Sequence, residues 1–384
     1  SRRQRQMCIR DRSFIEMNNL VFWAHSYCRS TLKFYSELAK ALSRNCFIYT
    51  WIENLDLRSA TGFSNSEFSD LKIVHIGNDI DLAEKTLANH IDDYNIFCAY
   101  QTCPVYQHLM NILIRKKTRY GMFSEAPCNM DEYPKRFFKE LYLRCFLPVK
   151  LKNIISNADF ILNASGYYEK GLFNLGWKPE QIISCGYYPP RIPGSKLMER
   201  TENNWHNFTI LLSGLHQWHR SPWILLEALD ILKKKGFMPK CYITQSGPYL
   251  GKVQDYAKKR QLSNVEFLGF VDISKLIDLY ESCSVYVGCG NYEPWGMRLN
   301  DCLQCGAPLI VNRGMGGVKM VDEYNCGLSF NRGDYIGLAN AMERLMTDKA
   351  LYLQIAKNAI YAAEEIRPEK ATVKYAAKIK KFIQ

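Results

Sequence analysis

The first half of the chain alternates between short apolar segments and longer segments in which apolar residues recur every three to four positions. The short segments are rich in β-branched and aromatic residues and predict strands at residues 20–25, 46–52, 71–76, 95–100, 120–123, 158–163 and 182–185. The longer segments predict helices at residues 30–42, 105–116, 133–156 and 167–175. Alternating strands and helices favour a parallel sheet with crossover helices.

A polar, proline-rich stretch interrupts this pattern and predicts a linker. Residues 188–194 read YPPRIPG, and residues 199–204 read ERTENN. The alternation then returns, with strands predicted at 208–212, 240–244, 265–268, 285–289 and 308–311 and helices at 223–235, 251–260, 273–280 and 297–305. The sequence therefore predicts an α/β protein with two doubly wound, Rossmann-like domains. Their strand ends would face each other across a cleft, where ligands bind in such folds.

Composition narrows the class of protein. The length of 384 residues suggests two domains, and no run of 18 apolar residues predicts a transmembrane helix. The 14 cysteines are scattered along the chain, which favours buried thiols in a reducing compartment over a disulfide framework. The net charge of +12 indicates an anionic partner: nucleic acid, a membrane surface or a phosphorylated ligand.

The first residues of the chain are strongly basic. Residues 1–13 contain five arginines and one aspartate, and no apolar core of a targeting peptide follows them. The string is typical of translated adapter read-through in assembled metagenomic sequences. We therefore interpret residues 1–16 as a non-native head and Met17 as the natural start, which leaves a charge of about +8 for the rest.

Two carboxylates frame a predicted loop-to-helix junction. Glu293 precedes Pro294 and Gly296, and Asp301 follows eight positions later, just over one turn into the helix. Amide groups in the first turn of that helix are available to an anion. A carboxylate accepts two hydroxyl hydrogen bonds, as a sugar diol requires. Spacing alone favours the alternative, in which one carboxylate caps the helix and the other is a solvated residue of the helix surface.

Four glycine-containing loops follow predicted strands in the same half of the chain. They span residues 213–220, 245–248, 264–271 and 312–318. The first combines Gly214, which permits close backbone approach, with Arg220, a guanidinium suited to phosphate. Because the carboxyl ends of parallel strands share one edge of a sheet, the four loops are expected to converge there.

This ordered set resembles the donor domain of family-4 retaining glycosyltransferases of the GT-B fold, the glycosyl transferases group 1 domain. The family has a glycine–basic loop, G-x-G-P, F-L-G-F-V, E-P-F-G-x-x-x-x-E, A-C-G-x-P-V and a G-G loop in that order. The matching segments here lie at 214–220, 245–248, 267–271, 293–301, 304–308 and 316–317. The likeness covers about residues 200–365, and the rhythm of residues 17–190 is compatible with the family's acceptor domain.

The resemblance implies a division of the chain. Residues 17–190 would bind the acceptor, 191–204 would link the domains, and 205–365 would bind a nucleotide-sugar donor. Residues 366–384 would form a C-terminal helix that packs back on the N-terminal domain.

The resemblance also implies roles for individual residues. Glu293 would contact the donor sugar and its phosphate region, Arg220 would bind phosphate, and Asp301 would hold the ribose diol. Backbone amides at residues 295–297 would meet the sugar and diphosphate, and the side chains at 270 and 271 would lie near the base. The donor-binding residues so implied are Gly214, Gly247, Phe270, Val271, Pro294, Trp295, Gly296, Met297 and Asp301.

Two departures from the family pattern affect the donor side. Asp301 replaces the family's second glutamate and is one methylene shorter, and Leu215 replaces an arginine that binds phosphate. His216, His219 and Arg313 are alternative sources of the missing cation. On the acceptor side, residues 123–127 read FSEAP where the family often has a His-Asp pair, so Glu125 is predicted to do the acceptor-side catalytic work.

No metal ion or other cofactor is expected. Asp79 and Asp81 spell D-x-D, a metal–diphosphate motif of a different glycosyltransferase fold, but they stand at a predicted helix start, which favours capping. Cys302 and Cys305 form a C-x-x-C without a second such pair, and lie inside a predicted helix, which favours buried thiols. His25, at the end of the first strand, faces the cleft or serves as a cap.

Aromatic and basic residues interleave in the N-terminal half at Lys135, Arg136, Lys139 and Arg144. This pattern suggests an anionic membrane surface as a partner. A nucleic-acid partner is not expected, because no nucleic-acid-binding motif accompanies the charge.

The sequence thus predicts a retaining glycosyltransferase that moves a sugar from a nucleotide-sugar donor to a glycan or lipid-linked glycan acceptor in cell-surface polysaccharide synthesis. The predicted location is cytoplasmic and peripheral on the inner face of the plasma membrane. The alternative is a non-catalytic nucleotide-sugar-binding subunit. A dinucleotide oxidoreductase is not favoured, because no G-x-G-x-x-G opens the first strand–helix turn.

Overall fold

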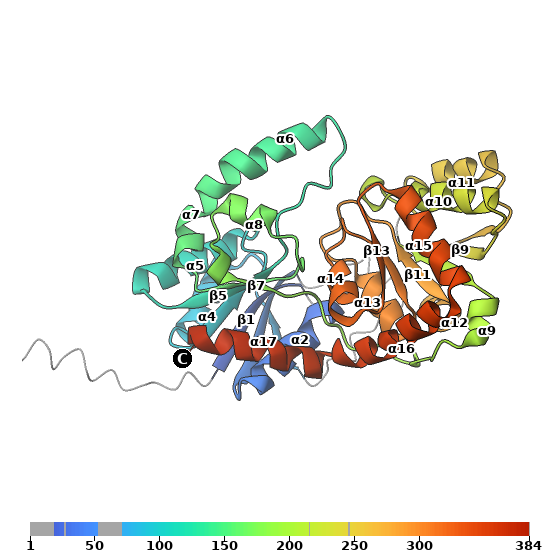
Figure 1. Cartoon of the computed structure of the whole chain (residues 1–384). Coiled ribbons are helices and arrows are strands. Elements are labelled where there is room, and N and C mark those ends of the chain that lie inside the picture. Colours follow the sequence, from blue (N-terminus) through green and yellow to red (C-terminus); the bar gives the residue numbers. More distant parts are fainter. Residues whose placement is uncertain (1–18, 27, 53–70, 215, 245, 384) are drawn as a thin grey trace, which may run out of the picture.

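Two units, each built on one parallel sheet, make up the computed structural model of this chain (Figure 1). The structure describes residues 19–26, 28–52, 71–214, 216–244 and 246–383. The predicted non-native head with Met17, and the departure at Leu215, lie outside these residues.

The N-terminal unit contains a seven-stranded sheet in the order β3-β2-β1-β4-β5-β6-β7. Its strands are β1 (Asn19–Ser26), β2 (Asn45–Ile52), β3 (Ile73–His75), β4 (Tyr94–Phe97), β5 (Tyr120–Ser124), β6 (Ile161–Asn163) and β7 (Ile182–Ser184). Its helices are α2 (Arg29–Ala41), α4 (Ile80–Ala88), α5 (Pro104–Lys116), α6 (Lys135–Leu141), α7 (Leu147–Asn157) and α8 (Lys170–Leu175). A π-helical segment, Tyr142–Phe146, joins α6 to α7. All seven predicted strands are confirmed.

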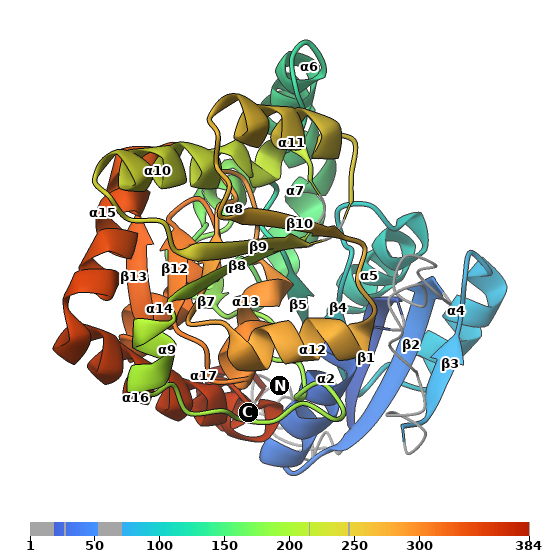
Figure 2. The same cartoon turned by 90° about the vertical axis from the view of Figure 1, so that its right-hand side faces the viewer.

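The C-terminal unit contains a six-stranded sheet in the order β10-β9-β8-β11-β12-β13. Its strands are β8 (Thr209–Ser213), β9 (Lys240–Thr244), β10 (Val265–Gly269), β11 (Val285–Gly288), β12 (Leu309–Asn312) and β13 (Gly327–Phe330). Its helices are α9 (Glu202–His206), α10 (Trp223–Lys234), α11 (Leu250–Lys259), α12 (Ile273–Ser282), α13 (Met297–Gln304), α14 (Val318–Tyr324), α15 (Tyr335–Thr347) and α16 (Lys349–Glu365). Figure 2 turns the C-terminal unit toward the viewer and shows α10 and α11 beside one another.

Both sheets reverse their strand order beside their first strand. The reversal lies between β1 and β4 in the N-terminal unit and between β8 and β11 in the C-terminal unit. In open α/β sheets, ligands bind outside the carboxyl ends of the strands at such switch points. The observed topology confirms the predicted pair of doubly wound, Rossmann-like domains. Each sheet therefore has one switch point at which a ligand could bind.

The last helix, α17 (Pro368–Ile383), returns to the N-terminal unit and packs beside α2 (Figure 1). The Tyr375 hydroxyl lies 2.7 Å from the Tyr188 hydroxyl, and its ring lies 6.1 Å from that of Phe34. Apolar side chains of both units and of α17 belong to one continuous buried cluster. The two units are therefore held together by packing as well as by the chain that links them, whose residues 185–201 contain neither helix nor strand.

Two motifs have structural roles. The Asp79 carboxylate caps α4 by accepting a hydrogen bond of 2.9 Å from the Leu82 amide, as predicted for the D-x-D sequence. Cys302 and Cys305 are buried, free thiols on and just after α13, which confirms that interpretation too. None of the helices in the described ranges combines the length and the apolarity needed to cross a bilayer.

Candidate functional site

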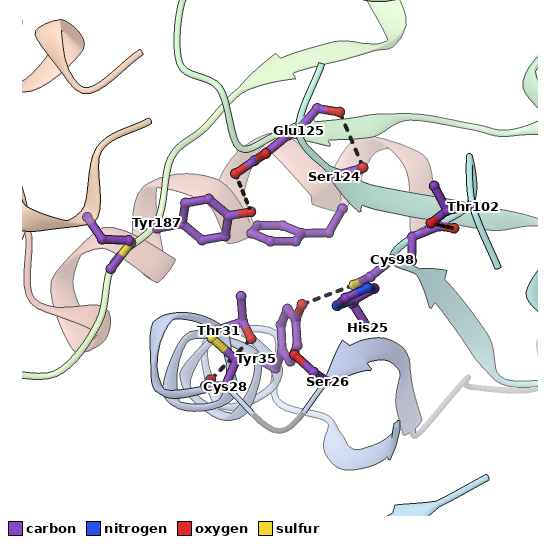
Figure 3. Close-up of a pocket in the computed structure, with 13 residues that line it drawn as sticks. His25, Ser26, Cys28, Thr31, Tyr35, Cys98, Thr102, Ser124, Glu125 and Tyr187 are labelled. Atoms are coloured by element: carbon purple, nitrogen blue, oxygen red, sulfur yellow. Dashed lines mark hydrogen bonds between the residues drawn. The ribbon is translucent and has the colours of Figure 1, made fainter. Parts of the chain in front are cut away.

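A cavity of about 350 Å³ lies at the carboxyl ends of β1, β4 and β5, at the switch point of the N-terminal sheet (Figure 3). Its polar lining comes from strand ends and from α2. Among the described residues, Met297, the first residue of α13, is the lining residue that comes from the C-terminal unit. The lining residues are His25, Ser26, Cys28, Thr31, Tyr35, Cys98, Ala99, Thr102, Phe123, Ser124, Glu125, Tyr187 and Met297. The cavity therefore adjoins both units, and it can hold part of a polar substrate.

Glu125 stands in this cavity directly after β5. Its Oε1 accepts a hydrogen bond of 3.1 Å from the Tyr187 hydroxyl, which comes from the segment after β7 (Figure 3). Burial, and then the charge of Glu125, raise the pKa of Tyr187 well above its usual value. The hydroxyl therefore stays protonated and orients the carboxylate. Sequence analysis did not identify Tyr187, because nothing in its local sequence distinguishes it from a core tyrosine.

Two other groups in the cavity, the Tyr35 hydroxyl and the Cys98 thiol, stay protonated and unreactive. The Tyr35 hydroxyl and the Cys98 thiol lie 3.0 Å apart, and burial raises the pKa of Cys98 to about 12. Cys98 is therefore a neutral thiol at physiological pH and is not an activated nucleophile. His25 lines the cavity, which resolves the alternative left open by the sequence in favour of the cleft.

At the switch point of the C-terminal sheet, the structure brings Arg220 and Glu293 together. Arg220 Nε lies 3.2 Å from Glu293 Oε2, and Arg220 Nη2 donates a hydrogen bond of 3.2 Å to Oε1. Both side chains are partly exposed, at 32% for Arg220 and 15% for Glu293. The two residues predicted to act on the donor thus form a two-pronged ion pair that remains open to solvent.

Short loops hold this pair in place. Gly214 has a φ of +136°, and a Cβ at that position would lie 3.0 Å from Arg220 Nη1, so the glycine makes room for the guanidinium. The Asn291 amide donates to the His219 carbonyl at 2.8 Å, which ties the two loops together. On the other side, the Gly316 amide donates to the Glu293 carbonyl at 3.1 Å. Loop glycines therefore serve here mainly to let backbone segments approach one another.

The first turn of α13 presents amide groups beside Glu293. Gly296 is its N-cap residue and has a φ of +96°, a left-handed conformation that favours glycine. Within the described ranges, no hydrogen bond is found for the backbone amides of Trp295, Gly296 or Met297. Unsatisfied amides at a helix N-terminus are suited to an anion. The geometry is that expected for a group that carries phosphate.

The Trp295 side chain is buried and has a structural role, whereas the backbone amide of the same residue is available to a ligand. It is 1% exposed, and its Nε1 donates a hydrogen bond of 2.6 Å to Asn300 Oδ1. A Cβ at Gly186 would lie 2.2 Å from the Trp295 ring, so the ring packs directly on the chain between the two units. Pro294 is also buried. These two side chains shape the loop and present no surface to a ligand in this structure.

Asp301 occupies an environment that the sequence did not suggest. Its carboxylate is buried between two guanidinium groups, with Oδ1 3.6 Å from Arg29 Nη1 and Oδ2 3.5 Å from Arg298 Nη1. Arg29 is the first residue of α2 and belongs to the N-terminal unit. Asp301 therefore joins the two units electrostatically, in addition to any contact with a ligand.

Other predicted donor-side residues lie on the same edge of the sheet. Phe270 is 56% exposed after β10, whereas the Val271 side chain is buried in the core. A Cβ at Gly247 would lie 2.6 Å from the His216 carbonyl oxygen, so this glycine permits contact between two loops.

The cations suggested as replacements for the arginine absent at position 215 are not available in this structure. Arg313 forms an ion pair with Asp322, with Nη1 and Nη2 each 3.2 Å from a carboxylate oxygen. Burial lowers the pKa of His219, so that its ring is neutral at physiological pH. His216 is buried beneath the loop. The shortage of positive charge predicted from the sequence is therefore not relieved by these three residues.

The second half of the chain matches a known protein family. Residues 196–361 match the family described as glycosyl transferases group 1. A comparison with curated protein sequences gives no significant match.

Several solved structures are similar over nearly the whole chain. Alr3699/HepE from Anabaena, solved in complex with UDP, has 15% sequence identity and a TM-score of 0.66, with 94% of this chain and 100% of that chain covered. A glycosyltransferase from Rickettsia africae has 14% identity and a TM-score of 0.63, with 95% and 98% covered. The lipopolysaccharide outer core galactosyltransferase WaaB has 12% identity and a TM-score of 0.62, with 95% and 99% covered. At these identities the likeness concerns the fold.

Proposed function

We propose that this protein transfers a sugar from a nucleotide-sugar donor to a glycan or lipid-linked glycan, with retention of anomeric configuration. Its GT-B fold and the match of residues 196–361 to the family described as glycosyl transferases group 1 support the proposal. The observation that carries the proposal is the Arg220–Glu293 pair, which lies beside unsatisfied amides at the start of α13 and at the switch point of the C-terminal sheet. A carboxylate for sugar hydroxyls, a guanidinium and helix-terminus amides for phosphate are the groups that a nucleotide sugar requires.

On the donor side, each group has a role that follows from its chemistry. Glu293 accepts hydrogen bonds from sugar hydroxyls, which loosens its pairing with Arg220. Arg220 and the amides of residues 295–297 then bind the diphosphate and stabilise the charge that develops on it as the leaving group departs. This electrostatic stabilisation is the main catalytic contribution that we assign to the protein. We further propose that Asp301 binds the ribose diol, that the exposed Phe270 side chain contacts the base, and that no metal ion is needed.

On the acceptor side, we assign the cavity beside Glu125 to the acceptor hydroxyl. Tyr187 orients the carboxylate, and the position of Met297 in the lining brings the start of α13 next to the cavity. A carboxylate held in this way accepts a hydrogen bond from the attacking hydroxyl and aligns it. The deprotonation step in retaining transfer is assigned to an oxygen of the departing diphosphate.

We also propose a cytoplasmic location, peripheral at the inner face of the plasma membrane, and a role in cell-surface polysaccharide synthesis. The absence of disulfides among the described cysteines supports a reducing compartment. Exposed side chains on α6, on α7 and on the π-helical segment between them support a membrane surface as the partner. The apolar residues Phe137, Phe138, Phe146 and Val149 are 61%, 66%, 62% and 76% exposed, and exposed Lys135 and Lys139 lie among them.

The membrane partner is tested by sedimentation with vesicles. The protein is expected to pellet with vesicles that contain anionic lipid at low salt and to be released as salt screens the basic residues. Changing Phe137 and Phe138 together to serine should abolish pelleting, whereas Val373→Ser, at an equally exposed valine on α17, should leave it unchanged. Recovery of the wild-type protein in the supernatant at low salt would contradict the membrane assignment.

A panel of nucleotide sugars tests the function itself. A genuine donor at a hundredfold excess over its Kd should stabilise the fold by about 2.7 kcal/mol, measured as a rise in Tm. The same donor should be hydrolysed slowly in the absence of acceptor. Donor-dependent stabilisation with no hydrolysis and no transfer would favour the non-catalytic subunit. No stabilisation by any nucleotide sugar would contradict donor binding altogether.

A further inference from the structure

Two arginines from different units approach the ring of Tyr292, the residue that precedes Glu293. The Cζ of Arg136, on α6, lies 4.3 Å from the ring centroid, and the Cζ of Arg332, which follows β13, lies 4.4 Å from it. Trp218 stacks with Tyr292 at a centroid distance of 5.7 Å, and Arg136 also lies over its ring. Two positive charges are thus gathered on one aromatic platform beside the candidate donor site.

Neither the Arg136 nor the Arg332 guanidinium is held by a carboxylate in an ion pair among the described residues, whereas that of Arg220 is. A hydrogen bond from Asn129 lowers the pKa of Glu140, however, and the charge of Arg136 contributes to this shift. Cation–π contact stabilises each guanidinium, but it leaves the charge in place. Two like charges on one ring repel each other, so the arrangement favours an anion that binds both.

The positions of both arginines are held by backbone contacts. The Arg136 amide donates to the Glu132 carbonyl at 2.7 Å, and Asn129 Nδ2 donates to the Arg136 carbonyl at 2.8 Å. Glu132 in turn accepts a hydrogen bond from Tyr249 of the C-terminal unit. These contacts hold the segment before α6 against the C-terminal unit.

Arg332 is positioned from the other side. The amide of the next residue, Gly333, donates a hydrogen bond of 3.1 Å to Asn291 Oδ1, one residue before Tyr292. The same oxygen accepts a hydrogen bond of 2.9 Å from Asn312 Nδ2. Arg332 is therefore tied to the loop that carries Glu293.

We propose that Arg136 and Arg332 together bind a phosphate group of a substrate, and so supply the positive charge that residues 215, 219 and 313 do not. The inference rests on the proposed function and adds a phosphate subsite to it. The phosphate belongs either to the donor diphosphate or to a phosphorylated acceptor, since both present the same chemistry to paired guanidinium groups. Because Arg136 comes from the N-terminal unit, the subsite is complete only when the two units are together.

Pyrophosphate binding, measured by calorimetry on the full chain, tests the subsite independently of sugar transfer. Arg136→Gln and Arg332→Gln are each expected to weaken pyrophosphate binding about tenfold, and the double variant about 100-fold, through loss of charged hydrogen bonds. Arg136→Lys keeps the charge but loses the planar, stacked guanidinium, so its pyrophosphate affinity should lie between that of Arg136→Gln and that of the wild type. Lys240→Gln removes a comparable cation–π contact, 4.7 Å from the Tyr242 centroid at the amino end of β9, and should change nothing.

UDP affinity and the acceptor KM distinguish the two sources of phosphate. A donor subsite predicts that the single glutamine variants bind UDP about tenfold more weakly without acceptor. An acceptor subsite predicts unchanged UDP binding and an acceptor KM about tenfold higher. Equal pyrophosphate binding by the wild type and the folded double variant, or none by either, would overturn the inference. Loss of pyrophosphate binding in a protein that transfers no sugar would support the subsite and contradict only the proposed function.

Discussion

Glu293→Gln is expected to reduce sugar transfer by a factor of about 100 to 1,000 while leaving the fold intact. The amide keeps the shape of the side chain but removes the charge that pairs with Arg220 at 3.2 Å and that receives sugar hydroxyls in the proposed donor complex. Removal of one preorganised electrostatic partner in an active site has effects of this size on kcat. Because both side chains are partly exposed, the cost to folding should be about 1 kcal/mol or less. Steady-state transfer kinetics and thermal unfolding of the same preparation measure both quantities.

A second glutamate on the C-terminal unit provides the control. Glu227 also pairs with an arginine, Arg260, at 3.3 Å, but it lies on α10 and has no contact with the cleft loops among its described interactions. Glu227→Gln should therefore transfer at the wild-type rate. A Glu293→Gln protein that melts normally and transfers as fast as the Glu227→Gln control would remove Glu293 from the site.

Asp301→Asn is expected to have the largest effect on stability, lowering the free energy of unfolding by about 3 kcal/mol. The substitution leaves Arg29 and Arg298 beside a neutral amide in a buried position, and removing one partner of a buried ion pair typically costs 3–5 kcal/mol. The lower end of that range applies because the N–O distances, 3.5 and 3.6 Å, are long. Thermal and urea unfolding measure the change.

The same variant separates this structural role from the proposed contact to ribose. If Asp301 holds the ribose diol, the donor KM should rise about 10- to 150-fold with little change in kcat, because the ribose does not change charge during transfer. Arg29→Met provides the comparison, since it removes the contact between the units but leaves Asp301 paired with Arg298. A donor KM raised equally in both variants would assign the effect to the contact between the units. Unchanged stability in Asp301→Asn would contradict the buried pairing.

The positions of most strands and helices follow from the sequence because the determining forces are local. A short run of β-branched and aromatic residues, as in β1 and β8, predicts a central strand, because such a strand is buried on both faces of the sheet. The prediction fails where the local preference for a strand is weak. β13 reads GLSF, and because glycine and serine do not favour strands, this strand is recognised only by its pairing with β12. Residues 133–156, predicted as one helix, form α6, a π-helical segment and α7.

The place of the candidate site also follows from the sequence, because the glycine loops, Arg220 and Glu293 all follow strands whose carboxyl ends meet at one edge of a sheet. The partners of each side chain, in contrast, are known only from the three-dimensional fold. Tyr187 reaches Glu125 from the segment after β7, Arg29 reaches Asp301 from the other unit, and Arg136 reaches Tyr292 across the same boundary. The physical reason is that an ion pair or a ring contact depends on where two elements distant in the chain are packed, and local periodicity carries no information about that distance.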